Sequence, residues 1–127
     1  MSKDSASGCI CTPRQIKPNK GEKIFNKTTF SPFTATGINE FLKKNEIQCL
    51  VFTGLATSQC VETTARDASD NGYSIIHIED AQADYRDQEH LYSLFSSTSV
   101  CGGWVTDTAS FLENYESFLA KVKEEER

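Results

Sequence analysis

The stretch from Leu50 to Ala65 contains a candidate nucleophile shortly after a run of apolar residues. The run predicts a buried strand, and Cys60 lies about where a helix should begin. A thiol at a helix N-terminus faces unpaired backbone N–H groups and the positive end of the helix dipole, and both stabilise a thiolate. Thr57 or Ser58 could cap some of these donors, and free amides could bind an oxyanion. The pattern allows nucleophilic attack by Cys60; the alternative is a small buried residue that packs a helix start.

Three further ionisable side chains have weaker positional signals. Lys27 follows a short β-rich stretch, and from its position alone we expect a solvated lysine at a strand end. His77 is expected in the middle of a strand with its nitrogens hydrogen-bonded, and His90 is expected on a helix surface. Neither histidine has Asp, Glu or Cys neighbours at metal-ligand spacing, so we predict no metal site and no cofactor.

The five cysteines do not form a pattern typical of disulfide or zinc sites, because their number is odd and none stands in a C-x-x-C pair. Cys9 and Cys11 form a Cys-x-Cys pair in a loop-like segment, Cys49 is expected in the core, and Cys101 is undecided. A redox protein that uses Cys9 and Cys11 is a third functional hypothesis, with little support because a flexible loop offers no structural setting for the thiols.

The elements that must position these residues are predicted by hydrophobic periodicity from residue 23 onward. Residues 1–22 are rich in Pro, Gly and Lys, so we expect an irregular N-terminal segment followed by a domain at 23–127. Strands are predicted at 23–27, 49–52, 73–78 and 100–105. Helices are predicted at 37–45, from about 60 to the Asn71-Gly72 stop, at 88–95 and at 108–126. This alternation predicts an α/β fold with a parallel sheet, whose reactive groups gather at the carboxyl ends of the strands.

Composition limits the classes of function. The chain has 127 residues, with 13 Lys and Arg against 18 Asp and Glu, and its formal net charge of −5 argues against electrostatic binding of nucleic acid. No apolar run approaches the ~20 residues of a membrane span, and the start MSKDSASG lacks the charged-then-apolar order of a signal peptide. The sequence therefore predicts a cytoplasmic globular domain that binds neither nucleic acid nor membrane.

Two motifs resemble those of the isochorismatase-like cysteine hydrolases, a superfamily that includes isochorismatases, nicotinamidases, N-carbamoylsarcosine amidohydrolases and ureidoacrylate amidohydrolases. The first motif is KxxFSxF, from Lys27 to Phe33, and the second contains GLATxxCVExTA within the stretch Val51 to Ala68. The resemblance extends from about Gly8 to Leu119. It implies a three-layer α/β/α fold around a mostly parallel sheet.

For the site, the resemblance implies an Asp–Lys–Cys triad. Cys60 matches the nucleophile that attacks a carbonyl, and Lys27 matches the lysine that stabilises the thiolate. An ammonium group near a thiol favours its attacking form, so the physical chemistry agrees. The backbone N–H groups of Ala56 and Cys60 match the family's oxyanion hole, and a non-proline cis peptide is expected between Leu55 and Ala56.

The sequence departs from the family at its beginning. The family's first strand ends in the catalytic Asp and lies in the middle of the sheet, whereas nothing of this kind precedes Lys23, and Asp4 lies in a polar stretch that does not match it. In members that bind a metal the ligands also lie in that region, so no metal site carries over. We expect an incomplete sheet whose unpaired apolar edges associate, as a homo-oligomer or with another chain. The two flanking strands could instead close up, or the chain could be the later part of a longer product.

Two functions follow from these features. The first is a cysteine hydrolase acting on a small amide or ureido (C–N) substrate, with Phe30 and Phe33 either walling a pocket for a flat substrate or belonging to the core. Since the family's catalytic Asp, which takes up and returns protons, has no match in this sequence, we expect weak activity from this chain alone. The second is a catalytically impaired family remnant that acts as a binding or partner module.

Overall fold

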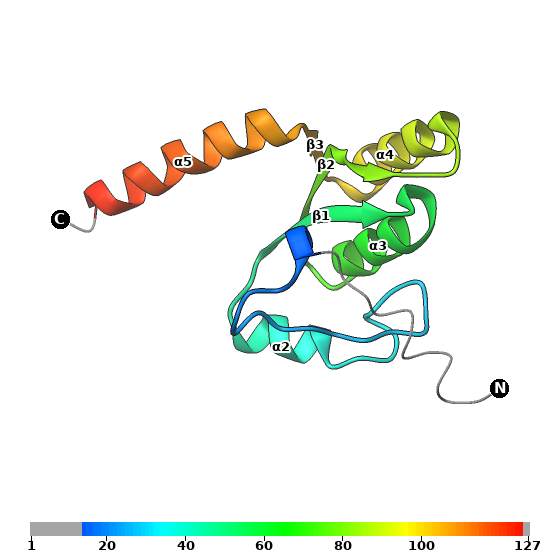
Figure 1. The fold of residues 1–127 in the computed structure, drawn as a ribbon, viewed down its shortest axis with the longest axis horizontal. Coiled ribbons are helices and arrows are strands. Elements are labelled where there is room, and N and C mark those ends of the chain that lie inside the picture. The colour runs from blue at the N-terminus through cyan, green and yellow to red at the C-terminus, as the bar shows by residue number, and fades with distance from the viewer. Residues whose placement is uncertain (1–13, 126–127) are drawn as a thin grey trace.

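The computed structural model describes residues 14–125, which form a parallel sheet with flanking helices (Figure 1). The described elements are, in chain order, η1 (Arg14–Ile16), α2 (Ile38–Lys44), β1 (Cys49–Leu55), η2 (Thr57–Val61), α3 (Glu62–Asp70), β2 (Ser74–Ala83), α4 (Asp87–Cys101), β3 (Trp104–Thr106) and α5 (Thr108–Glu125). The strand order is β1-β2-β3, and both pairings are parallel. The predicted α/β fold with a parallel sheet is confirmed.

Helices α3 and α4 contact each other and pack on the sheet, whereas α5 extends away from it (Figure 1). The main core cluster lies between the sheet and α3 and also takes in α2; it consists of Leu42, Phe52, Val61, Ala65, Ala68, Tyr73 and Ile75. The opposite side of the sheet carries the cross-strand row Val51, Ile76 and Trp104. Val51 is 45% exposed and Trp104 is 61% exposed, so this second side is partly uncovered within the described residues.

The pairing of β1 with β2 sets the position of the loops that follow both strands. It runs from Cys49 opposite Ser74 to Leu55 opposite Ala83, with a register shift between Phe52 and Gly54. Since the strands are parallel, their carboxyl ends meet at one edge of the sheet. The turn η2 after β1 therefore lies beside the loop after β2.

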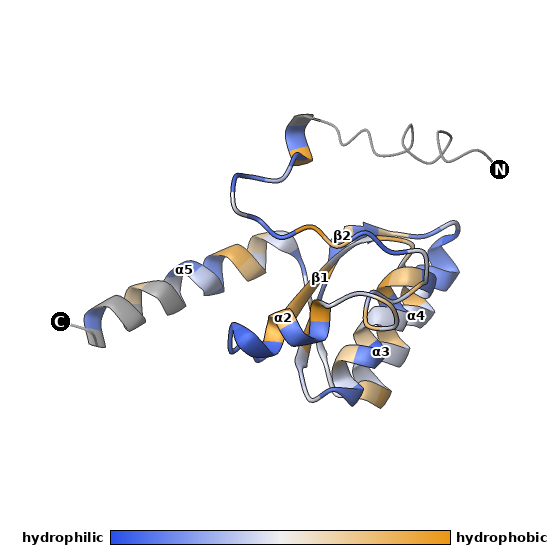
Figure 2. Cartoon of the chain, turned by 90° about the horizontal axis from the view of Figure 1, so that it is seen from below, coloured by the Kyte–Doolittle hydropathy of each residue, from blue (hydrophilic) through white to orange (hydrophobic). Residues whose placement is uncertain are grey.

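The strand predicted at 23–27 is absent from the structure. This segment is an extended coil in which the Phe25 ring packs edge-on against Phe41 at 5.5 Å between centroids and Lys23 lies over the Phe25 ring. A strand needs a neighbouring ladder for its backbone groups, and β1 pairs with β2 alone among the described strands. The β-rich composition of residues 23–27 was therefore not enough to form a strand. Figure 2 shows that part of this coil is apolar, as is β1.

The strand predicted at 100–105 is also largely wrong. Helix α4 continues through Cys101 and ends at Gly102, whose left-handed φ of 72° is typical of a helix C-terminus. The strand β3 begins at Trp104. Gly102, which falls inside the predicted strand, is therefore a helix stop.

Two burial predictions fail because β1 is the edge strand of the described sheet. Cys49, expected in the core, is exposed, and the strand expected to be covered on both faces has only Phe52 fully buried. The other helices match better: α2, α3 and α5 lie close to their predicted ranges. No helix within residues 14–125 combines the length and apolarity needed to cross a membrane.

Candidate active site

The turn that carries Cys60 begins directly after β1. The peptide bond between Leu55 and Ala56 is cis, and Ala56 itself has an extended backbone. The Ala56 carbonyl then accepts hydrogen bonds from Gln59 N at 3.0 Å and Val61 N at 3.3 Å, closing a single wide helical turn over Thr57–Val61. Cys60 is thus the fourth residue of the helical run and not its first, which corrects the predicted start of the helix.

The first turn is capped by residues from outside it. Neither Thr57 nor Ser58 makes the predicted side-chain cap. The Thr57 hydroxyl instead donates to the Ala83 carbonyl at 3.2 Å and lies 2.7 Å from Nδ1 of His90, while the Ser58 N–H donates to Asp84 Oδ2 at 2.6 Å. The competing partners on β2 and α4 explain why local capping fails.

Lys27 and Cys60 are brought together although they are 33 positions apart in the chain. Lys27 Nζ donates to Cys60 Sγ at 3.5 Å and to the Thr29 carbonyl at 2.8 Å. Cys60 is half-buried, and Lys27 is exposed. An ammonium group at this distance favours the thiolate over the thiol. The arrangement therefore places a cation beside the candidate sulfur nucleophile.

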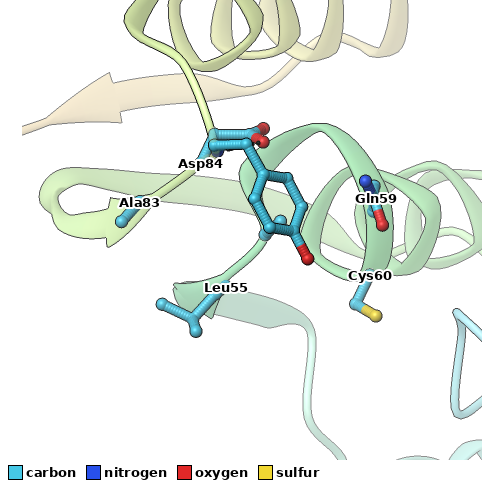
Figure 3. A pocket seen from close by; sticks show the side chains of 7 residues that line it. Leu55, Gln59, Cys60, Ala83 and Asp84 are labelled. Carbon is cyan, nitrogen blue, oxygen red and sulfur yellow. Dashed lines mark hydrogen bonds between the residues drawn. The ribbon is translucent and has the colours of Figure 1, made fainter.

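Cys60 lines two cavities. The first, of about 390 Å³, is drawn in Figure 3 and is lined by Leu55, Ala56, Gln59, Cys60, Ala83, Asp84 and Tyr85. The second, of about 440 Å³, is lined by Lys27, Thr28, Thr29, Phe30 and Cys60. The sulfur is therefore accessible from a largely apolar cavity on one side and from the cavity that holds the Lys27 ammonium on the other.

The two candidate pocket phenylalanines are placed differently. Phe30 is 59% exposed and lines the second cavity. Phe33 packs against the core cluster, with its ring centroid 6.1 Å from that of Tyr73. Phe33 therefore belongs to the core, whereas the role of Phe30 in binding a flat substrate stays a prediction.

Asp84 is a site residue that the sequence reasoning missed. It follows β2 directly, and its second carboxylate oxygen accepts the Tyr85 N–H at 2.8 Å. Hydrogen bonds from Ser58 hold the pKa of Asp84 below its ordinary value, so the carboxylate is ionised at neutral pH. The strand predicted at 73–78 continues to Ala83 in the structure, and this longer β2 is what places Asp84 at the carboxyl end of a strand.

The back of the turn is held by a polar network with α4. The Ser93 hydroxyl bonds to the Thr57 carbonyl at 3.0 Å and to Glu62 Oε2 at 2.6 Å, and Arg66 pairs with Glu62 at 2.7 Å. His90, predicted on the helix surface, is partly buried through its contact with Thr57. The prediction failed because helix periodicity does not reveal which side of α4 meets the turn.

His77 is remote from both cavities. It is 1% exposed, stacks on Phe52, and its Nδ1 lies 3.0 Å from Gln82 Nε2. Its Nε2 has no hydrogen-bond partner among the described residues, so the expectation that both nitrogens are bonded holds for one. Burial lowers the pKa of His77.

Cys101 lines neither of the two cavities beside Cys60. Cys101 lies near Arg66, with its sulfur 3.9 Å from a guanidinium nitrogen. Asp4, Cys9 and Cys11 lie outside the described residues. Within residues 14–125 there is no cluster of three or more His, Cys, Asp or Glu side chains that could hold a metal ion.

Comparison with known proteins gives a consistent family match. The family model described as "Isochorismatase domain" matches residues 13–110. An uncharacterized isochorismatase family protein of Bacillus subtilis, YrdC, is 44% identical over 79 residues, which are 61% of this chain and 42% of YrdC. The ureidoacrylate amidohydrolase RutB of Variovorax paradoxus is 31% identical over 101 residues, which are 80% of this chain and 40% of RutB.

A solved structure supports the same fold. The N-carbamoylsarcosine amidase of Thermoplasma acidophilum superposes with a TM-score of 0.68 at 33% sequence identity, over 75% of this chain and 53% of the amidase. The chain spans about two fifths of the length of the two curated relatives that it matches.

Proposed function

This chain belongs to the isochorismatase family, and we propose that it is a cysteine hydrolase that cleaves the C–N bond of a small amide or ureido substrate. The observation that carries the proposal is the 3.5 Å contact between Lys27 Nζ and Cys60 Sγ. The named activities of RutB and of the N-carbamoylsarcosine amidase support a C–N substrate. Both act on a carbonyl flanked by nitrogen, which suits a nucleophilic thiol.

The proposed reaction has two stages. The Cys60 thiolate, paired with the Lys27 ammonium, attacks the substrate carbonyl carbon and forms a C–S bond. The C–N bond then breaks, and the leaving amine takes up one proton, equal to the one released when the thiol ionised. Water then attacks the resulting thioester, or the thiocarbamate formed from a ureido substrate: a C–O bond forms, the C–S bond breaks, and the protons of water go to the released acid and the Cys60 sulfur. We propose that the Ala56 and Cys60 N–H groups bind the oxyanion in both stages.

Proton transfer is the weak part of this proposed site. Among the described residues that line the two cavities, Asp84 is the one carboxylate, and both its oxygens already accept backbone N–H groups. As far as the described residues go, we propose that solvent supplies and accepts the protons in place of a positioned side chain. General acid–base catalysis typically contributes 10²–10⁴-fold, so we expect turnover about that much slower than with a proton carrier in place.

The direct test is hydrolysis of a small panel that contains ureidoacrylate, N-carbamoylsarcosine and a simple aromatic amide. The wild-type chain should release amine or ammonia slowly and carry an acyl or carbamoyl adduct on Cys60, detected by peptide mass. Cys60→Ala should abolish both, whereas Cys101→Ala, a matched loss of another thiol, should change neither. Equal hydrolysis by Cys60→Ala, or neither product nor adduct from the wild type, would overturn the proposal.

A second candidate function is a binding or partner module. It is favoured by apolar side chains that remain exposed on the described surface, among them Leu55 at 74% and Phe95 at 70%. Such side chains suit association with a second copy or with a related chain. Mass measurement in solution separates the two: a monomer that hydrolyses the panel supports the enzyme, and an inactive stable oligomer supports the module.

A further inference from the structure

Asp84 connects the loop after β2 to the turn that carries Cys60. Its Oδ2 accepts the Ser58 N–H at 2.6 Å, and its Oδ1 accepts the Tyr85 N–H at 2.8 Å. Figure 3 shows Asp84 and Cys60 among the labelled residues around the same cavity. Ser58 lies two positions before Cys60, so the carboxylate holds the backbone close to the sulfur, and we assign it no direct contact with the sulfur.

The turn needs such a partner because a helical run leaves its first N–H groups without acceptors. The Ala56 carbonyl takes the N–H groups of Gln59 and Val61, and no side chain of the turn makes a cap. The Ser58 N–H therefore has its acceptor on a different element. A carboxylate at this position also complements the positive end of the helical run.

The pairing of β1 with β2 sets the distance between Ser58 and Asp84, which are joined by this hydrogen bond. Leu55 pairs with Ala83, so the residues that follow them lie side by side at the edge of the sheet. The Thr57 hydroxyl reaches the Ala83 carbonyl at 3.2 Å, which places a second bond beside that of Asp84. The loop after β2 and the turn after β1 are thus joined twice.

From this geometry we propose that Asp84 is a positioning residue: its carboxylate anchors the Thr57–Cys60 turn so that the Cys60 sulfur stays against the Lys27 ammonium. The inference deepens the proposed hydrolase function and rests on it for its catalytic meaning. The anchoring itself is tested through the reactivity of the Cys60 thiol, which can be measured without a substrate.

A positioning role and a purely electrostatic role of Asp84 predict opposite changes in the alkylation rate of Cys60. The charged or titratable side chains that line the cavities beside Cys60 are Lys27, Asp84 and Tyr85. A negative charge near a thiol disfavours the thiolate, so removing Asp84 speeds alkylation of Cys60 if charge alone acts. Removing an anchor slows alkylation, because the sulfur moves away from the ammonium. The sign of the change therefore separates the two roles.

The experiment measures the alkylation rate of Cys60 with limiting iodoacetamide at pH 7.5, read by peptide mass, in the full chain. Asp84→Ala should slow alkylation by on the order of tenfold, since small displacements at reacting atoms have large effects. Asp84→Asn keeps an oxygen acceptor for Ser58 and should stay within about twofold of the wild type. If a panel substrate is hydrolysed, Asp84→Ala should lower kcat with little change in KM.

A matched control is available on the same strand, where β2 lies beside the end of β3. The Asp80 carboxylate accepts the backbone N–H and hydroxyl of Thr108 at 2.8 Å each, at the start of α5, and lines neither cavity beside Cys60. Asp80→Ala therefore removes a similar cap and should leave Cys60 alkylation unchanged. Slowing by Asp80→Ala as large as by Asp84→Ala, or unchanged or faster alkylation in Asp84→Ala, would overturn the positioning role.

A wild-type measurement keeps the proposal testable if Asp84→Ala does not fold. Amide hydrogen exchange of Ser58 should be slowed relative to an unstructured amide, because the N–H is bonded to Asp84. Exchange at the unprotected rate would contradict the anchor. A chain that hydrolyses nothing but shows the expected alkylation pattern would refute the hydrolase function and retain the positioning role.

Discussion

The two halves of the candidate site are built in different ways. The turn with Cys60 is joined to β2 and α4 by side-chain hydrogen bonds from Thr57, Asp84 and Ser93. The segment with Lys27, called the coil below, spans residues 22–33; it is mostly exposed and forms no strand pairing. It reaches the rest of the molecule through the aromatic contact of Phe25 with α2 and through the packing of Phe33 on the core.

This difference indicates which half of the site sets the geometry of the Lys27–Cys60 pair. The sulfur is placed by the sheet register, and its position is coupled to the stability of the fold. The ammonium is placed by a coil with few anchors, so its position depends on local contacts. Substitutions in the turn should cost stability and reactivity together, whereas substitutions in the coil should change reactivity with little effect on stability.

The largest expected difference comes from two matched threonines. Thr57→Val removes a fully buried hydroxyl that bonds Ala83 and His90, and it should lower the free energy of unfolding by about 1–3 kcal/mol. Thr29→Val removes a half-buried hydroxyl that bonds the Ser31 carbonyl in the coil, and it should cost about 1 kcal/mol or less. Urea unfolding of both variants checks this, and equal costs would contradict the distinction between the halves.

A smaller effect separates the two phenylalanines of the coil. Phe33→Ala removes a ring packed on the core and should destabilise by about 1–2 kcal/mol. Phe30→Ala removes a ring that is 59% exposed and should stay within about 0.5 kcal/mol of the wild type. If Phe30 walls the substrate cavity, its loss should raise KM for a hydrolysed panel member; thermal unfolding and steady-state kinetics test both statements.

The smallest expected effect is a pH dependence in the half built on the sheet. Burial lowers the pKa of His77, so the unfolded chain binds a proton at a pH where the folded protein does not. Stability should therefore fall as pH decreases from about 7 to 5.5, below the ordinary histidine pKa of ~6.5. His77→Gln should flatten this slope. An unchanged slope in His77→Gln would contradict the assignment.

The sequence predicted the half of the site whose signals are local. An apolar run and a helix stop at Asn71-Gly72 are features of neighbouring residues, and β1 and α3 followed from them, although the helical run begins at Thr57 and not at about Cys60 as predicted. The pairing of Lys27 with Cys60 and the cis bond before Ala56 came from resemblance to a family, because neither is encoded in local periodicity.

The features that the sequence could not reveal are set by tertiary contacts. Residues 23–27 have a strand-like composition, but composition does not say whether a neighbouring ladder is available. The exposure of Cys49 depends on β1 being the edge of the described sheet. The role of Asp84 depends on the register of Leu55 against Ala83, which places it beside a turn far away in the sequence.

The central claim, that Lys27 activates Cys60, is tested most directly by the alkylation rate of Cys60 in Lys27→Met. Methionine keeps an unbranched stem and removes the charge, so the rate at pH 7.5 should fall on the order of tenfold without loss of thermal stability. Lys23→Met is the matched control, because Lys23 lies over the Phe25 ring in the same coil and lines neither cavity beside Cys60. Equal rates in the Lys27→Met and Lys23→Met proteins would show that the ammonium does not activate the sulfur.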